Sequence, residues 1–140
     1  MMMASLQGGL TFQKGLGAVH SMSHPLGGLK DPVLHHGTLN AVILPAVLRF
    51  NHGHAVDKCN ALARALGVSS GEALAGFIAE LNAAIGLPPS LRAMGVKDDV
   101  LPRMVDGALA DHSTATNPRP VSRADFEALF AESMGGRVHP

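Results

Sequence analysis

Three histidines gathered among glycines are the residues of this 140-residue chain whose types and spacing could do chemistry. His20 and His24 lie four residues apart, and His36 follows a turn-rich stretch. On a helix, side chains four residues apart leave the same face one turn from each other. Histidine is the commonest protein metal ligand and carries protons near neutral pH. The spacing therefore indicates a metal site, a proton-transfer site or both.

Two interpretations of these histidines are open from the residues alone. His20, His24 and His36 together could hold one divalent ion, because imidazole suits Zn, Fe, Ni and Cu and a catalytic metal site uses about three protein ligands. Alternatively, His20 and His24 are partly buried packing residues that hydrogen-bond to backbone carbonyls or to the hydroxyls of Ser21 and Ser23.

The elements that must position the histidines are predicted to be helices. No segment shows the alternating pattern of a strand, so we expect an all-α fold, a helical bundle of about five or six helices. We expect Pro45 to interrupt one helix, and the turn residues of 25–34 to form a loop. The apolar spacing places the helices at residues 1–23, 36–51, 56–66, 70–85, 97–109 and 123–133.

The composition excludes several classes of protein. Eleven acidic and eleven basic residues leave a formal charge of zero, which indicates neither a nucleic-acid nor an anionic-membrane partner. No apolar run reaches the roughly 18 residues that span a bilayer. The single Cys59 excludes an internal disulfide and indicates a reducing compartment, so we expect a cytoplasmic protein. The length predicts one domain, residues 1–134, followed by a flexible tail at 135–140.

The histidine region resembles the signature of a known family. Residues 15–28, which read Gly-Leu-Gly-Ala-Val-His-Ser-Met-Ser-His-Pro-Leu-Gly-Gly, and the segment 35–45 are similar to the histidine signature of the iron-containing (group III) alcohol dehydrogenases. Arg49-Phe-Asn51 and Asn117-Pro-Arg119 match that family as well. The resemblance runs from Met1 to Ser133 and covers only the family's C-terminal helical domain, of the type shared with dehydroquinate synthase.

The resemblance implies roles for individual residues. In that family an Asp and three His hold one divalent metal, and the two ligands in this part of the chain correspond to His20 and His36. His24 then lies near the nicotinamide and substrate and relays a proton, while His35 is a neighbour. The stretch between His20 and His36 is about two residues longer than the family's pattern, which leaves His35 open as the ligand. Ser113 corresponds to a position lining the substrate pocket, the alternative being a polar connector loop.

The function implied is that of the metal-binding catalytic half of an NAD(P)-linked dehydrogenase of small alcohols and aldehydes, with Fe²⁺ or Zn²⁺. The ligands and the nucleotide-binding domain expected upstream are not in this sequence, so we expect the chain to be inactive alone. Its partners would be the missing N-terminal half, or a second copy bound through the exposed domain face. Two alternatives are a non-catalytic helical interaction module or remnant without metal, and a free-standing metal protein using His20, His24 and His36.

Overall fold

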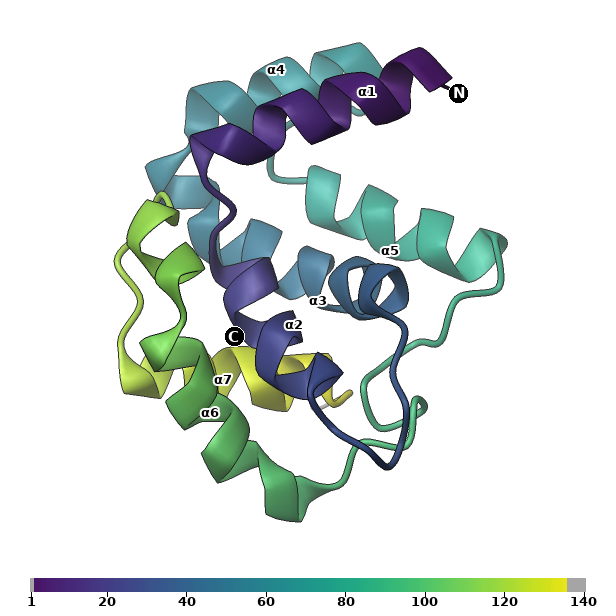
Figure 1. The fold of residues 1–140 in the computed structure, drawn as a ribbon. Helices are drawn as coiled ribbons and strands as arrows, with labels where there is room; N and C mark the ends of the chain where they lie inside the picture. The colour runs from purple at the N-terminus through teal and green to yellow at the C-terminus, as the bar shows by residue number, and fades with distance from the viewer. Residues whose placement is uncertain (1, 136–140) are drawn as a thin grey trace.

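The computed structural model describes residues 2–135, and within this range the chain is all-helical (Figure 1). The predicted all-α fold is therefore confirmed. Except for Gly135, the predicted tail lies outside the described residues. The α-helices are α1 (Met2–Thr11), α2 (Ala18–Gly27), α3 (His36–Asn51), α4 (Val56–Leu66), α5 (Leu74–Ala84), α6 (Leu101–Ala110) and α7 (Arg123–Ser133); short 3₁₀ helices are η1 (Phe12–Lys14), η2 (His52–His54), η3 (Asp98–Val100) and η4 (His112–Thr116).

The core is built around α2 and α3. Helix α2 packs against α3 and α6, while α3 also contacts α5 and α7, and α6 contacts α7. Burying one large apolar side chain contributes about 1.5–3 kcal/mol, so this cluster supplies the main stabilisation of the fold. The largest fully buried apolar side chains are Met22, Leu26, Leu39, Ile43, Leu91, Phe126 and Phe130.

The predicted helix over residues 1–23 is wrong as one continuous element. Gly15 and Gly17 have φ angles of +96° and +117°, a region that L side chains rarely adopt, and the chain turns there between η1 and α2. A Cβ on Gly15 would lie 2.5 Å from the Cβ of Thr116, so the close approach of η4 also requires glycine. This break raises the number of α-helices in residues 2–135 to seven, above the five or six expected.

The loop predicted at 25–34 begins later than expected. Helix α2 continues across Pro25 to Gly27, and Gly28 is its C-cap. Pro25 is accommodated by the neighbouring helix α6, where Gly107 leaves room for its ring; a Cβ at Gly107 would lie 2.7 Å from the Cβ of Pro25. The helical conformation thus extends one turn past His24, which keeps His20 and His24 on one helix.

Helix α3 is likewise not interrupted at Pro45, contrary to expectation, and runs unbroken from His36 to Asn51. Proline has no N–H, so the carbonyl of Ala41 lacks its usual intrahelical donor. The side-chain Nδ2 of Asn82, on α5, donates to this carbonyl at 2.7 Å. The missing backbone hydrogen bond is therefore replaced by one from the neighbouring helix.

Helix α1 has no buried residue and forms an apolar surface at the top of Figure 1. This α1 surface comprises Met2, Met3, Leu6 and Leu10 of the helix, together with Phe12 of η1, all more than half exposed. Within residues 2–135, no helix is both long and apolar enough to span a bilayer.

The replacement of the proline's hydrogen bond gives a first prediction. Asn82→Ala leaves the Ala41 carbonyl without a donor, and we expect it to lower the free energy of unfolding by about 1–3 kcal/mol. In a Pro45→Ala background the backbone N–H at position 45 can serve that carbonyl, so Asn82→Ala should cost less. Urea unfolding of the four proteins in a double-mutant cycle measures the difference. Equal costs in both backgrounds would contradict this account of α3.

Candidate active site

Three of the predicted histidines meet where α2 faces the N-terminus of α3. The ring centroids of His20 and His24 lie 5.6 Å apart, those of His20 and His36 5.3 Å, and those of His24 and His36 5.7 Å. His112 of η4 adds a fourth imidazole at the exposed edge, 6.1 Å from His24. The structure thus places His36 in the group, and it brings in His112, which the sequence analysis did not single out.

His20 and His36 each direct Nε2 at the side-chain amide of Asn40. Nδ2 of Asn40 lies 3.2 Å from Nε2 of His20 and 3.1 Å from Nε2 of His36. As the amide nitrogen can only donate, both imidazoles accept through Nε2 and carry their proton on Nδ1. Oδ1 of Asn40 is buried and has no hydrogen-bond partner among residues 2–135. Both Nε2 lone pairs are therefore directed at the amide nitrogen of Asn40, which lies between the two rings.

The protonation of His20 favours this ligand role. Burial lowers the pKa of His20, and the neighbouring His36 and His24 lower it further, whereas Asp111 acts in the opposite direction. A lowered pKa keeps the imidazole neutral at neutral pH, and only neutral imidazole binds a metal ion.

His24 has a different partner, the carboxylate of Asp111. Nδ1 of His24 lies 2.8 Å from Oδ2 of Asp111, and Oδ1 of Asp111 accepts a 2.8 Å hydrogen bond from the backbone N–H of Ser113. Burial raises the pKa of Asp111, but the hydrogen bonds from His24 and Ser113 outweigh this and hold that pKa below its ordinary value. The carboxylate is therefore ionised at neutral pH and accepts the Nδ1 proton of His24.

Ser113 and His35 lie apart from the three converging rings. The side chain of Ser113 is buried, and its Oγ has no hydrogen-bond partner within residues 2–135. His35 is the N-cap of α3, where its Nδ1 accepts a long, 3.4 Å bond from the backbone N–H of Thr38. This capping role turns His35 to the helix terminus, so His36 is the residue that reaches His20.

The helices that carry these histidines are joined by a pair of asparagines. Nδ2 of Asn117 donates to Oδ1 of Asn51 at 2.8 Å, and Nδ2 of Asn51 donates to Oδ1 of Asn117 at 2.9 Å. Oδ1 of Asn117 also accepts from the backbone N–H of Ala18, at 3.1 Å. This amide pair connects the first residue of α2, the last of α3 and the residue after η4. The sequence analysis named both asparagines only as part of a family motif.

Asp111 is the functional residue that sequence reasoning missed most clearly. The sequence analysis did not name it, because a sequence separation of 87 residues hides its contact with His24. The only indication in the sequence was that a carboxylate, that of Asp111, comes directly before His112 and Ser113.

The histidine nitrogens do not by themselves complete a metal site. Residues 2–135 contain no group of three or more His, Cys, Asp or Glu side chains placed to hold an ion. The converging nitrogens of His20 and His36 are two donors, one fewer than a catalytic metal site uses.

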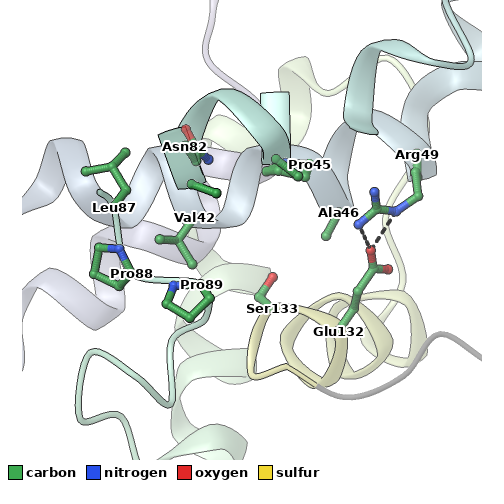
Figure 2. A pocket seen from close by; sticks show the side chains of 12 residues that line it. Val42, Pro45, Ala46, Arg49, Asn82, Leu87, Pro88, Pro89, Glu132 and Ser133 are labelled. Atoms are coloured by element: carbon green, nitrogen blue, oxygen red, sulfur yellow. Dashed lines mark hydrogen bonds and ion pairs between the residues drawn. The ribbon is translucent and has the colours of Figure 1, made fainter. Parts of the chain in front are cut away.

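A pocket of about 260 Å³ lies elsewhere, between α3, α5 and α7 (Figure 2). Its walls are largely apolar, and Arg49 pairs with Glu132 at one side, with Nε of Arg49 2.7 Å from Oε1. None of the predicted site residues lines it. The pocket therefore does not form part of the histidine group.

The chain was compared with protein families and known proteins. The model of the Fe-containing alcohol dehydrogenase family, C-terminal part, matches residues 1–134. The 4-hydroxybutyrate dehydrogenase of Cupriavidus necator is 48% identical, over 96% of this chain and 37% of the relative. The lactaldehyde reductase of Escherichia coli is 36% identical, over 83% of this chain and 32% of the relative. The chain thus spans about a third of the length of these curated relatives.

Solved structures share the fold. A 1,3-propanediol oxidoreductase superposes with a TM-score of 0.76 at 36% identity, over 84% of this chain and 32% of that one. An alcohol dehydrogenase from Oenococcus oeni gives a TM-score of 0.78 at 29% identity, with the same coverage of both chains. The helical arrangement that positions the histidines is therefore that of the corresponding third of these proteins.

The amide pair gives a second prediction. Asn117→Ala removes both Asn51 contacts, the acceptor of Ala18 N–H and the donor to the Arg119 carbonyl, and we expect it to lower the free energy of unfolding by about 2–4 kcal/mol. Asn51→Ala, the matched control, leaves Asn117 bonded to Ala18 and should cost about 1–2 kcal/mol. Urea unfolding of both variants gives the two values. A smaller loss for Asn117→Ala than for Asn51→Ala would show that the bond to Ala18 does not hold α2.

Proposed function

Because this chain belongs to the iron-containing alcohol dehydrogenase family, we propose that it forms the metal-binding, catalytic C-terminal part of an NAD(P)-linked dehydrogenase. The observation that carries the proposal is the convergence of Nε2 of His20 and Nε2 of His36 beside the ring of His24. The reaction is oxidation of a small alcohol to its aldehyde, or the reverse. The names of the relatives, which include 4-hydroxybutyrate dehydrogenase and lactaldehyde reductase, support short substrates.

The residues present suit a divalent metal. His20 and His36 are the proposed ligands, because both direct Nε2 at the amide of Asn40, whose nitrogen a bound ion would replace, and imidazole suits Fe²⁺ and Zn²⁺ alike. The buried, unpartnered Oδ1 of Asn40 marks the same place as one where polar groups are incompletely satisfied. When bound, the ion supplies Lewis-acid chemistry that lowers the pKa of an alcohol oxygen. The remaining ligands come from the part of the protein that corresponds to the rest of the relatives' length.

The proposed work of this chain's own residues is proton transfer and substrate contact. With Nδ1 of His24 bonded to Asp111, Nε2 is the nitrogen that takes the proton from an alcohol oxygen, or returns it to a carbonyl oxygen. We propose that Ser113 contacts the substrate, as the family resemblance implies; its side chain is buried in this structure. A nicotinamide held by another part of the enzyme would supply the hydride chemistry.

The exposed α1 surface supports a partner for this chain. Its large apolar side chains, from Met2 to Phe12, are more than half exposed, and contiguous apolar surface of this kind is usually covered in a functional assembly. We propose that the covering partner is the nucleotide-binding part of the enzyme. The same surface favours the second candidate function, a helical interaction module without catalysis.

A third prediction concerns metal binding by the chain itself. Zn²⁺ titrated into tag-free protein by calorimetry should bind at one site, and His20→Ala or His36→Ala should abolish the binding. His24→Gln should keep the affinity within about threefold, because its nitrogens face Asp111 and the substrate. His35→Ala is the matched control at a neighbouring position. Equal loss in His24→Gln would instead support a local site of three histidines.

A fourth prediction concerns activity. The segment of the Cupriavidus necator relative that aligns with this chain can be replaced by the chain, which is 48% identical to it. We expect the chimera to oxidise short alcohols with a nicotinamide cofactor, and the chain alone to be inactive. His24→Ala in the chimera should lower kcat by about 10²–10⁴-fold, as loss of a proton-transfer group does, while bound metal is retained.

The chimera also separates the two candidate functions. A folded, metal-loaded chimera without alcohol dehydrogenase activity would contradict the catalytic proposal. Activity with metal bound would leave the interaction module unsupported.

A further inference from the structure

We propose that Asp111 is a positioning residue that holds His24 as its Nδ1–H tautomer, with Nε2 unprotonated and turned to the reacting oxygen. The use made of Nε2 rests on the proposed function. The tautomer and its cause rest only on the contact between Asp111 and His24.

The first step is the fixed geometry of the carboxylate. Asp111 is the N-cap of η4, where Oδ1 accepts the backbone N–H of Ser113 at 2.8 Å. This bond orients the carboxylate so that Oδ2 faces Nδ1 of His24, also at 2.8 Å. The side chain of Asp111 is only 12% exposed, so water competes little for these bonds. The position of Asp111 is therefore set by the backbone of η4 and not by a freely rotating side chain.

The second step is the protonation of the pair. An ionised carboxylate can only accept, so the shared proton lies on Nδ1 of His24. In a neutral imidazole one nitrogen donates and the other accepts, and Nε2 must then carry the lone pair. This is the state a base needs in order to receive a proton from an alcohol. The opposite tautomer would present an N–H to the substrate and could not accept that proton.

The third step is the orientation of the ring. The His24 ring is close to parallel with those of His36 and His112, at interplanar angles of 14° and 22° and centroid distances of 5.7 and 6.1 Å. The hydrogen bond to Asp111 fixes the rotation of the His24 ring, because it turns the Nδ1 edge of the ring toward η4. Since Asp111 touches neither substrate nor metal-binding nitrogen, its effect passes through His24.

His112 does not compete for the same carboxylate. Its Nδ1 lies 3.8 Å from Oδ1 of Asp111, beyond hydrogen-bond distance, and its side chain is 84% exposed. His112→Gln is therefore a control that changes the adjacent residue and a stacked ring while it leaves the bond between Asp111 and His24 in place.

The test is ¹⁵N NMR of the histidine side chains in this chain, with EDTA present and at a pH where the imidazoles are neutral. Long-range ¹H–¹⁵N correlations distinguish the two tautomers, and His24→Gln assigns the resonances of His24. In the wild type we expect Nδ1 of His24 at a protonated-nitrogen shift and Nε2 at an unprotonated one. Asp111→Asn, which keeps an acceptor for Ser113 N–H, should move the two shifts toward each other, and His112→Gln should leave them unchanged.

Two results would overturn the proposal. One is a wild-type His24 that carries its proton on Nε2, a result that needs only the assignment from His24→Gln. The other is a folded Asp111→Asn protein whose His24 shifts match the wild type. Both are read on the chain alone, so they do not depend on dehydrogenase activity.

A kinetic measurement extends the test to the enzyme. In an active chimera, Asp111→Asn should lower kcat by about 10–100-fold, the usual effect of losing an outer-shell partner, with KM changed less than about threefold. An unchanged kcat would show that the tautomer is not used. An inactive chimera with the expected NMR result would contradict the proposed function and leave the positioning role of Asp111 intact.

Discussion

The amide pair of Asn51 and Asn117 is the interaction on which the arrangement of the histidines depends. Helix α2 begins after Gly17, which has no side chain to cap the helix, so its first N–H groups need an acceptor from elsewhere. Oδ1 of Asn117 supplies one to Ala18, two residues before His20. Because Asn51 ends α3 and Asn117 follows η4, the same pair fixes the elements that carry His36 and Asp111. The amide pair thereby connects the start of α2, the end of α3 and the residue that follows η4.

The packing around this pair extends the constraint to α7. The guanidinium of Arg119 lies 3.9 Å from the centre of the Phe50 ring and donates to Asp125, at 3.3 Å, in the first turn of α7. Such a cation–π contact is worth about 0.5–2 kcal/mol, according to how far water is excluded. The ends of α3 and α7 are therefore held beside the segment that follows η4. Asn51 and Arg119 are far apart in sequence, and these contacts bring their two segments together.

Three buried side-chain atoms in residues 2–135 lack a hydrogen-bond partner, and the third of them is Oγ of Ser133 on α7. Oδ1 of Asn40 and Oγ of Ser113 are buried without hydrogen-bond partners in residues 2–135. Each such atom costs about 1–3 kcal/mol. One belongs to the amide that bridges His20 and His36, and the other to the residue that follows His112. Ser133 lines the pocket between α3, α5 and α7, so such atoms are not confined to the histidine group.

The sequence by itself determined the helical class, the approximate extents of α3, α4 and α7, and the four-residue spacing of His20 and His24. These depend on local spacing and capping, which neighbouring residues decide. Only the tertiary structure decided that the chain turns between η1 and α2, that α2 and α3 continue across their prolines, and that His24 bonds to Asp111. Each of these outcomes depends on a group distant in sequence: Thr116 approaching Gly15, Gly107 making room for Pro25, Asn82 serving the carbonyl of Ala41, and η4 aiming a carboxylate at His24. The residues near each position in the sequence do not indicate these partners, because only the fold brings them into contact.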